Sequence, residues 1–311
     1  MKIATTCLFK KLRPGVGCAA LILVAACAAM RLSAAESAAV VTAKTLQVLD
    51  TFDARQGVAV DRDHVYAVNN YRITRHRKDD GSPQLQWDGI SEAGPIIHLD
   101  SGMVWQGRLY AAHSNYPRSP MTSSVEVWDV KTMEHVASHS FGIHLGSFTW
   151  LDRYQGYWWG AFGNYDKVQR GEQDPYGKTV NTQVVKMDEQ FRVLARWTLP
   201  QGILERIAPM SNSGGSWGPD GYLYLTGHDH PEIYVVQVPA RGMELRWVAT
   251  VEAPGIHGQG IAWDRSSDGR ILWGIRKRDR KVLQMDIPEI APRRASAAMS
   301  QIRGPGQFEQ E

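Results

Sequence analysis

The stretch 147–160, SFTWLDRYQGYWWG, contains two short apolar runs separated by a polar turn. A small or polar residue opens the first run, and the turn leads directly into the second. The same arrangement recurs at 56–68, 101–112, 215–225 and 259–275, at intervals of about 40 to 70 residues. From residue 45 onward no long stretch holds a helical period, so the pattern predicts an all-β protein built from a repeated unit.

Each of the first four units is followed by two further strand candidates, which gives the four strands of a propeller blade. The fifth unit supplies only three, so the missing outer strand is predicted over Leu46–Phe52, near the start of the chain. Such a strand leaves no free sheet edge between the first and last units. We therefore predict a single five-bladed β-propeller over 45–287, closed by an N-terminal strand. A sixth blade would need strands within 163–181, which is predicted to be a loop because it is rich in Gly, Asp, Lys and Gln.

Residues 1–35 predict a secretory signal. Four basic residues and no acid precede an apolar run over 17–30, and Ser33, Ala34 and Ala35 are small residues at the usual cleavage positions. The run is too short for a membrane-spanning helix, which needs about 20 residues. Residues 24–27, VAAC, also resemble a lipobox, in which Cys27 would become a lipidated N-terminus. We expect an exported protein, either periplasmic or secreted, or an outer-membrane lipoprotein anchored at Cys27.

The remaining composition excludes several classes of function. All three cysteines lie in the signal segment, so the mature protein has no disulfide, no Cys-zinc site and no Cys nucleophile. That segment carries five Lys and Arg, and its removal changes the net charge from +3 to about −2. No basic stripe points to nucleic acid. We expect a monomer, and residues 288–311 are predicted to form a flexible C-terminal tail.

Strand direction predicts where a functional site lies. In a four-stranded antiparallel meander, the loop after the second strand and the link into the next first strand are on the same face. Both sets of loops are rich in His, Asn and Gln, whereas the opposite face carries simple hairpin turns such as Asp220-Gly221. Polar groups that converge at a concave mouth indicate a binding site. We predict His113, His228 and Asp229 as catalytic residues, and Gln56, Asn69, Asn115, Asn164, Gln259 and Arg276 as substrate contacts.

Three chemistries are open for this set. His98, His113, His228 and His257 could bind one divalent metal ion in the central channel, since imidazole suits zinc, iron or copper. Asparagine side chains with Asp229 could instead bind calcium, although a single carboxylate is a poor calcium site. Metal-free acid–base catalysis is the third option, with a histidine titrating near neutral pH, Asp229 orienting it, and Arg276 holding a substrate carboxylate.

Two segments carry a resemblance to a known group of proteins. The segments 113–117, HSNYP, with 120–129, PMTSSVEVWD, and 226–229, TGHD, resemble secreted bacterial and fungal propeller proteins loosely labelled cycloisomerase. The likeness spans about 45–287 and implies a secreted propeller that acts on a small molecule. More distantly the chain is similar to gluconolactonase and lactonase propellers, whose metal sites use Glu, Asn and Asp. The histidine-rich mouth departs from that pattern.

The sequence therefore predicts an exported enzyme that acts on a small polar or carboxylated molecule, such as a lactone, a sugar acid or a carboxylated ring. Hydrolysis, elimination and isomerisation are all open as its reaction. The alternative is a non-catalytic ligand-binding or scaffold propeller. A glycosidase ranks lower, because it needs paired carboxylates and the predicted mouth has one clear Asp.

Overall fold

The computed structural model describes residues 38–89, 94–143, 145–169, 173 and 177–291. The predicted signal segment with Cys27, and the predicted tail beyond residue 291, lie outside the described residues. Among the described residues, no helix is long and apolar enough to span a membrane.

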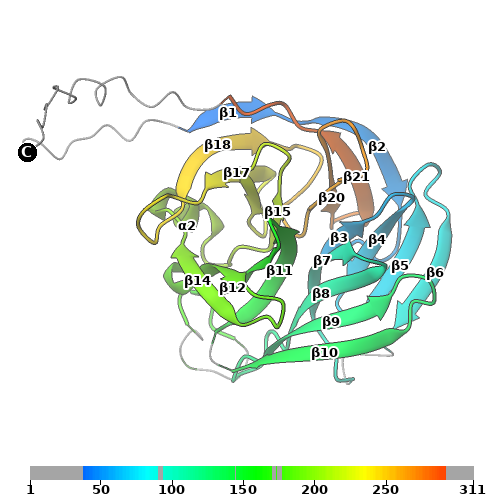
Figure 1. Cartoon of the computed structure of the whole chain (residues 1–311), viewed down its shortest axis with the longest axis horizontal. Coiled ribbons are helices and arrows are strands. Elements are labelled where there is room, and N and C mark those ends of the chain that lie inside the picture. The colour runs from blue at the N-terminus through cyan, green and yellow to red at the C-terminus, as the bar shows by residue number, and fades with distance from the viewer. Residues whose placement is uncertain (1–37, 90–93, 144, 170–172, 174–176, 292–311) are drawn as a thin grey trace, which may run out of the picture. The chain divides into compact units, whose positions relative to one another are not determined.

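Five small sheets form a five-bladed β-propeller, which confirms the predicted fold (Figure 1). We number the blades I to V in chain order. Blade I consists of β3 (Gly57–Val60), β4 (His64–Asn69), β5 (Arg72–Arg77) and β6 (Pro83–Asp88). Blade II consists of β7 (Leu99–Trp105), β8 (Arg108–Ser114), β9 (Ser123–Asp129) and β10 (His135–Gly142). Blade III consists of β11 (Ser147–Tyr154), β12 (Tyr157–Gly163), β13 (Gln183–Met187) and β14 (Val193–Thr198).

Blades IV and V each include a strand from the start of the described chain. Blade IV consists of β15 (Gly214–Trp217), β16 (Leu223–Thr226), β17 (Glu232–Gln237) and β18 (Arg246–Glu252), with β1 (Ala39–Thr42) added in parallel on the outside. Blade V consists of β19 (Ala262–Trp263), β20 (Ile271–Arg276), β21 (Lys281–Asp286) and β2 (Lys44–Asp50).

The closing strand was predicted at Leu46–Phe52 and lies at Lys44–Asp50, antiparallel to β21. The N-terminal segment therefore completes the last blade, as the missing fourth strand required. The pairing of β1 with blade IV was not predicted, because its four residues carry no turn signal that separates them from β2. Helices are few among the described residues: α2 (Gln201–Ile207) and the 3-10 turn η1 (Thr179–Asn181). Beyond the end of β12, the described part of 163–181 contains no strand, in agreement with five blades.

The hydrophobic core is divided into five clusters, and each lies between two neighbouring blades. Tyr66 and Leu109, for example, belong to one cluster between blades I and II, and Trp150 and Leu225 belong to another between blades III and IV. This division arises because strands such as β4 and β9 are buried on both faces, so each blade packs against a neighbour on either side. Fully buried aromatic rings such as Trp128, Trp150 and Trp273 fill these interfaces.

The inner strands come very close together near the axis. A Cβ atom on Gly260 would lie 2.7 Å from the Cα of Gly57 and 2.7 Å from the Cβ of Ser101. The backbone N–H of Gly260 donates to the carbonyl of Gln56 at 2.8 Å, which joins blade V to blade I. Small residues at the head of the inner strands are therefore required by close packing around the axis.

Candidate functional site

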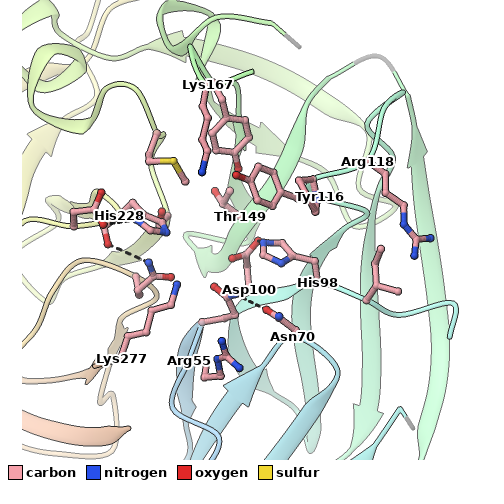
Figure 2. A pocket seen from close by; sticks show the side chains of 18 residues that line it. Arg55, Asn70, His98, Asp100, Tyr116, Arg118, Thr149, Lys167, His228 and Lys277 are labelled. Carbon is pink, nitrogen blue, oxygen red and sulfur yellow. Dashed lines mark hydrogen bonds and ion pairs between the residues drawn. The ribbon is translucent and has the colours of Figure 1, made fainter. Parts of the chain in front are cut away.

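A cavity of about 570 Å³ opens at the predicted mouth of the propeller (Figure 2). It is lined by the segments that enter each inner strand and by the loops that follow each second strand, and all five blades contribute. Its size is typical of small-molecule sites. Five of the predicted site residues line it: Gln56, His98, His228, Asp229 and Gln259.

His113 does not line this cavity. It is buried, its Nδ1 lies 2.8 Å from the hydroxyl of Ser124, and its Nε2 accepts a hydrogen bond from the backbone N–H of Ile97 at 3.3 Å. Burial lowers the pKa of His113 to about 4, with Glu126 nearby acting in the opposite direction. His113 on β8 is paired with Ser124 on β9, and its ring contacts that residue instead of the cavity. This placement does not support the predicted catalytic role.

Three asparagines that were predicted to contact substrate form hydrogen bonds within or between loops and do not line the cavity. Asn69 donates to Asp53 at 3.2 Å, and Asn115 donates to the carbonyl of Pro120 at 2.9 Å. Asn164 donates to the carbonyl of Asn181 at 3.2 Å. Asparagine side chains commonly satisfy loop backbone in this way, so these placements do not support the predicted substrate contacts.

Arg276 and His257 also lie outside the cavity lining. Arg276 forms an ion pair with Asp279 within its own turn, at 2.7 Å from Nε to Oδ1. The Nδ1 atom of His257 is buried without a hydrogen bond to any described residue. The side chain that enters the cavity from this turn is Lys277, one position after Arg276.

The predicted four-histidine metal site is not assembled in this arrangement. Two of its members, His98 and His228, line the cavity, while His113 and His257 do not. Across the residues that the structure describes, no group of three or more His, Cys, Asp or Glu side chains could hold a metal ion. Metal binding therefore stays a prediction of the sequence.

Asp100 is the unusual group in the cavity, and the sequence analysis did not select it. Its carboxyl is 4% exposed, and its Oδ2 atom is buried without a hydrogen bond. Burial raises the pKa of Asp100 well above its ordinary value, and the nearby Lys277 only partly opposes this shift. A buried carboxyl with a raised pKa and a free oxygen is typical of an acid–base group.

A bulge in β7 explains how Asp100 reaches the cavity. The pairing of β7 with β8 is regular at Leu99 with His113 and resumes at Gly102 with Ala111, so the register shifts between them. A bulge bends the strand and changes the direction of side chains, and bulges are frequent next to active sites. The strand pattern alone gives no sign of this shift.

His98 lies beside Asp100, with 3.8 Å between its Nε2 and the Oδ2 of Asp100. Burial, with smaller contributions from His113, Lys277 and His228, lowers the pKa of His98 to about 3. The imidazole is therefore neutral at neutral pH. Burial also raises the pKa of Tyr116, which packs against His98.

His228 and Asp229 form a second acid–base pair at the mouth. The Nδ1 of His228 lies 2.6 Å from the Oδ1 of Asp229, so the carboxylate orients the ring. Burial lowers the pKa of His228, assisted by Lys277 and Lys167, while the hydrogen bond to Asp229 raises it. The backbone carbonyl of His228 accepts a hydrogen bond from Gln259 at 3.1 Å.

Gln259 itself has a backbone φ of +68°, which is uncommon for a residue with a side chain. Its N–H donates to the carbonyl of Gly227 at 2.9 Å, and its carbonyl accepts from Thr226 at 2.5 Å. These bonds connect the entry to blade V with the loop that carries His228. Residues held in such conformations cluster at functional sites.

Basic side chains surround these groups. Among the described residues, Arg55, Arg118, Lys167 and Lys277 line the cavity together with two carboxyl groups, Asp100 and Asp229. Burial lowers the pKa of Lys277, as does Arg55, whereas Asp100 and Asp229 raise it. The cavity is therefore electrostatically suited to an anion.

Comparisons with known proteins find similar solved structures at low sequence identity. No protein-family model matches the sequence, and no curated protein matches it significantly. A glutaminyl cyclase of Myxococcus xanthus is similar over 81% of this chain and 100% of its own, with a TM-score of 0.55 at 11% identity. A virginiamycin B lyase of Staphylococcus aureus covers 78% of this chain and 99% of its own at 9% identity, with a TM-score of 0.43.

A luciferin-regenerating enzyme also has a TM-score of 0.43, at 11% identity over 72% of this chain and 73% of its own. At 11% identity the likeness to the glutaminyl cyclase shows the fold alone and assigns no activity. The sequence resemblance to proteins labelled cycloisomerase stays a prediction.

The cavity lies on the face that the sequence predicted, but several residues that line it were not among the predicted site residues. Asp100 is two residues after His98, which was selected, and Lys277 is adjacent to Arg276. Tyr116 and Tyr165 each follow a second strand, in the loops that were predicted to converge. Lys277, Tyr116 and Tyr165 therefore share a signal, which is a charged or aromatic side chain in the two sets of converging loops.

Proposed function

We propose that this protein is an enzyme that binds a small carboxylated molecule at the propeller mouth and moves a proton on it, by elimination or isomerisation. The observation that carries the proposal is Asp100. Its buried carboxyl, with one oxygen that no described residue binds, lies in a cavity rich in basic side chains. Arg55 and Lys277 would hold the substrate carboxylate, since both line the cavity close to one another.

Asp100 and His228 both line the cavity and would serve as its two acid–base groups. One of Asp100 and His228 would take a proton from the carbon next to the substrate carboxylate. The other would return a proton to a different carbon, which is isomerisation, or to a departing oxygen, which is elimination. A carboxyl with a raised pKa and a histidine with a lowered pKa can both exchange protons near neutral pH.

The cavity gives less support to hydrolysis through a nucleophilic hydroxyl. Apart from the tyrosines, Thr149 and Ser213 are the hydroxyl side chains that line it. Thr149 donates to the carbonyl of Ala161 at 3.4 Å, and Ser213 donates to the carbonyl of Ser211 at 3.5 Å. Neither is hydrogen-bonded to a histidine, which a serine or threonine nucleophile needs for activation.

A screen in D₂O would test this function. Purified protein is incubated with carboxylic acids, sugar acids and lactones, and deuterium uptake and product formation are followed by NMR. We expect exchange at a carbon next to a carboxylate, and a loss of about 10²-fold or more in the rate for Asp100→Asn. Asp63→Asn, in a turn on the opposite face, is the matched control and should keep the full rate.

Two results would contradict the proposal. One is unchanged turnover of a found substrate by Asp100→Asn. The other is tight binding of carboxylates with no exchange and no product, which would indicate a ligand-binding propeller instead.

A further inference from the structure

The basic side chains that line the cavity carry more positive charge than one substrate carboxylate can neutralise. Arg55, Lys167 and Lys277 line it without an ion pair to any described residue, and they come from three different blades. The two acids do not balance them. Asp229 is hydrogen-bonded to His228, and burial favours the neutral form of Asp100.

These basic side chains lie at two separate ends of the cavity. Figure 2 shows Lys167 on one side, and Arg55 with Lys277 on the other. Lys167 is placed by the loop after β12 in blade III, whereas Lys277 follows β20 in blade V and Arg55 precedes β3 in blade I. A ligand with one acidic group would leave one end without a partner.

Aromatic rings form a wall along one side of the cavity. The rings of His98 and Tyr116 have centroids 5.1 Å apart at an interplanar angle of 38°. Those of Tyr116 and Tyr165 are 5.0 Å apart at 46°. All three line the cavity, and Asp100 lies next to this wall through its contact with His98. Aromatic surfaces favour flat, polarisable partners that can stack or pack edge to face.

We propose that the ligand of this cavity is a flat dianion: an aromatic or unsaturated molecule with an acidic group at each end. The assignment rests on the proposed function for the identity of the site, and adds the class of substrate. One acidic group would bind Arg55 and Lys277, the second would bind Lys167, and the flat centre would lie along His98, Tyr116 and Tyr165. A volume of about 570 Å³ accommodates one such ring with its two substituents.

Isothermal titration calorimetry with three probes separates charge from flatness. Terephthalate is flat and has two opposed carboxylates, benzoate lacks the second carboxylate, and trans-cyclohexane-1,4-dicarboxylate lacks the flat ring. We expect terephthalate to bind at least about tenfold more tightly than benzoate, as one charged hydrogen-bonding group contributes. It should also bind several-fold more tightly than the cyclohexane compound.

Variants then assign each preference to its residue. Lys167→Gln should remove the advantage of terephthalate over benzoate and leave benzoate affinity unchanged. Tyr116→Leu should remove the advantage of the flat ring, and Tyr116→Phe should keep it. Lys131→Gln, on an exposed turn of blade II, is the control and should change neither ratio. Circular dichroism verifies that each variant is folded.

The outcomes distinguish this proposal from the proposed function. Equal binding of terephthalate and benzoate, or no effect of Lys167→Gln on their ratio, would overturn the dianion assignment. If terephthalate binds as expected and Asp100→Asn binds it equally, while no carboxylate shows proton exchange, then the ligand class stands and the enzymatic function is wrong. If proton exchange occurs only with monoanions or saturated acids, the enzymatic function stands and the dianion assignment is wrong.

Discussion

The Asp100 side chain combines two properties that seldom occur together in a stable core. It is almost fully buried, and one of its oxygens has no hydrogen-bonding partner among the described residues. Proteins normally satisfy such atoms, because an unpaired buried polar group costs about 1–3 kcal/mol. A protein that keeps such an unpaired atom often uses it in binding or catalysis. The Nε2 of the neighbouring His98 lies 3.8 Å from this oxygen, which is too far for a hydrogen bond.

This burial predicts a pH-dependent cost to stability. Because burial raises the pKa of Asp100, the folded protein binds that proton more tightly than the unfolded chain does. Ionisation therefore destabilises the fold progressively as pH rises above about 4, the ordinary value for an unfolded aspartate. We expect Asp100→Asn to be more stable than the native protein at pH 8, by about 0.5–2 kcal/mol. The difference should disappear toward pH 4.

Urea unfolding followed by circular dichroism across pH 4 to 8 measures this difference. Asp63→Asn should show no such pH-dependent gain. If Asp100→Asn were less stable than the native protein at every pH, the carboxyl would have a structural partner that the geometry does not show.

At the scale of the element, β2 is the strand that joins the two ends of the propeller. It pairs with β21 over its length, and only one of its side chains is deeply buried. Leu49 is 6% exposed and packs with Val58 and Val282 between blades V and I, whereas Leu46 is 47% exposed. Closure therefore combines backbone pairing with a single apolar anchor.

The two leucines of β2 provide a matched pair of substitutions. Leu49→Ala should lower the free energy of unfolding by about 2–4 kcal/mol, because it leaves a cavity between the first and last blades. Leu46→Ala should cost less than about 0.5 kcal/mol, since that side chain faces solvent. Chemical denaturation of both variants measures the contrast, and equal losses would mean that Leu49 is not the anchor of this strand.

At the scale of the whole molecule, one carboxylate links three blades on the face opposite the cavity. Asp152 of blade III accepts hydrogen bonds from Ser216, at 3.0 Å, and from the backbone N–H of Trp217, at 2.7 Å. It also forms an ion pair with Arg265 of blade V at 2.7 Å. Ser216 in turn accepts from the backbone N–H of Trp263 at 3.1 Å. The network couples blades III, IV and V through buried polar contacts.

Removing this link should weaken the ring without affecting the cavity. We expect Asp152→Ala to lower the free energy of unfolding by about 2–3 kcal/mol, because the buried donors of Ser216 and Trp217 lose their partner. Glu189→Gln, which disturbs only an exposed ion pair with Arg153, should cost less than about 1 kcal/mol. Denaturation curves give both values, and terephthalate affinity should stay unchanged in both variants. A loss as small in Asp152→Ala as in the control would show that the network does not hold the blades together.

The sequence by itself determined the fold, because short strands separated by turn residues recur as a repeated unit, and this repeat is visible without knowledge of the strand partners. It also determined which ends of the strands meet, since antiparallel direction follows from strand order. The convergence of His98, His228, Asp229 and Gln259 on one cavity follows from those two facts.

The tertiary structure alone decided which side chains point into that cavity. Arg276 ends β20 and pairs with Asp279, whereas Lys277 begins the following loop and lines the cavity, a difference that loop residues without a period do not reveal. His113 lies on a regular strand, and its direction was fixed by a register that only the pairing with β9 defines. The bulge at Asp100 is likewise a property of two paired strands. Orientation at a site depends on long-range packing, and local sequence does not encode it.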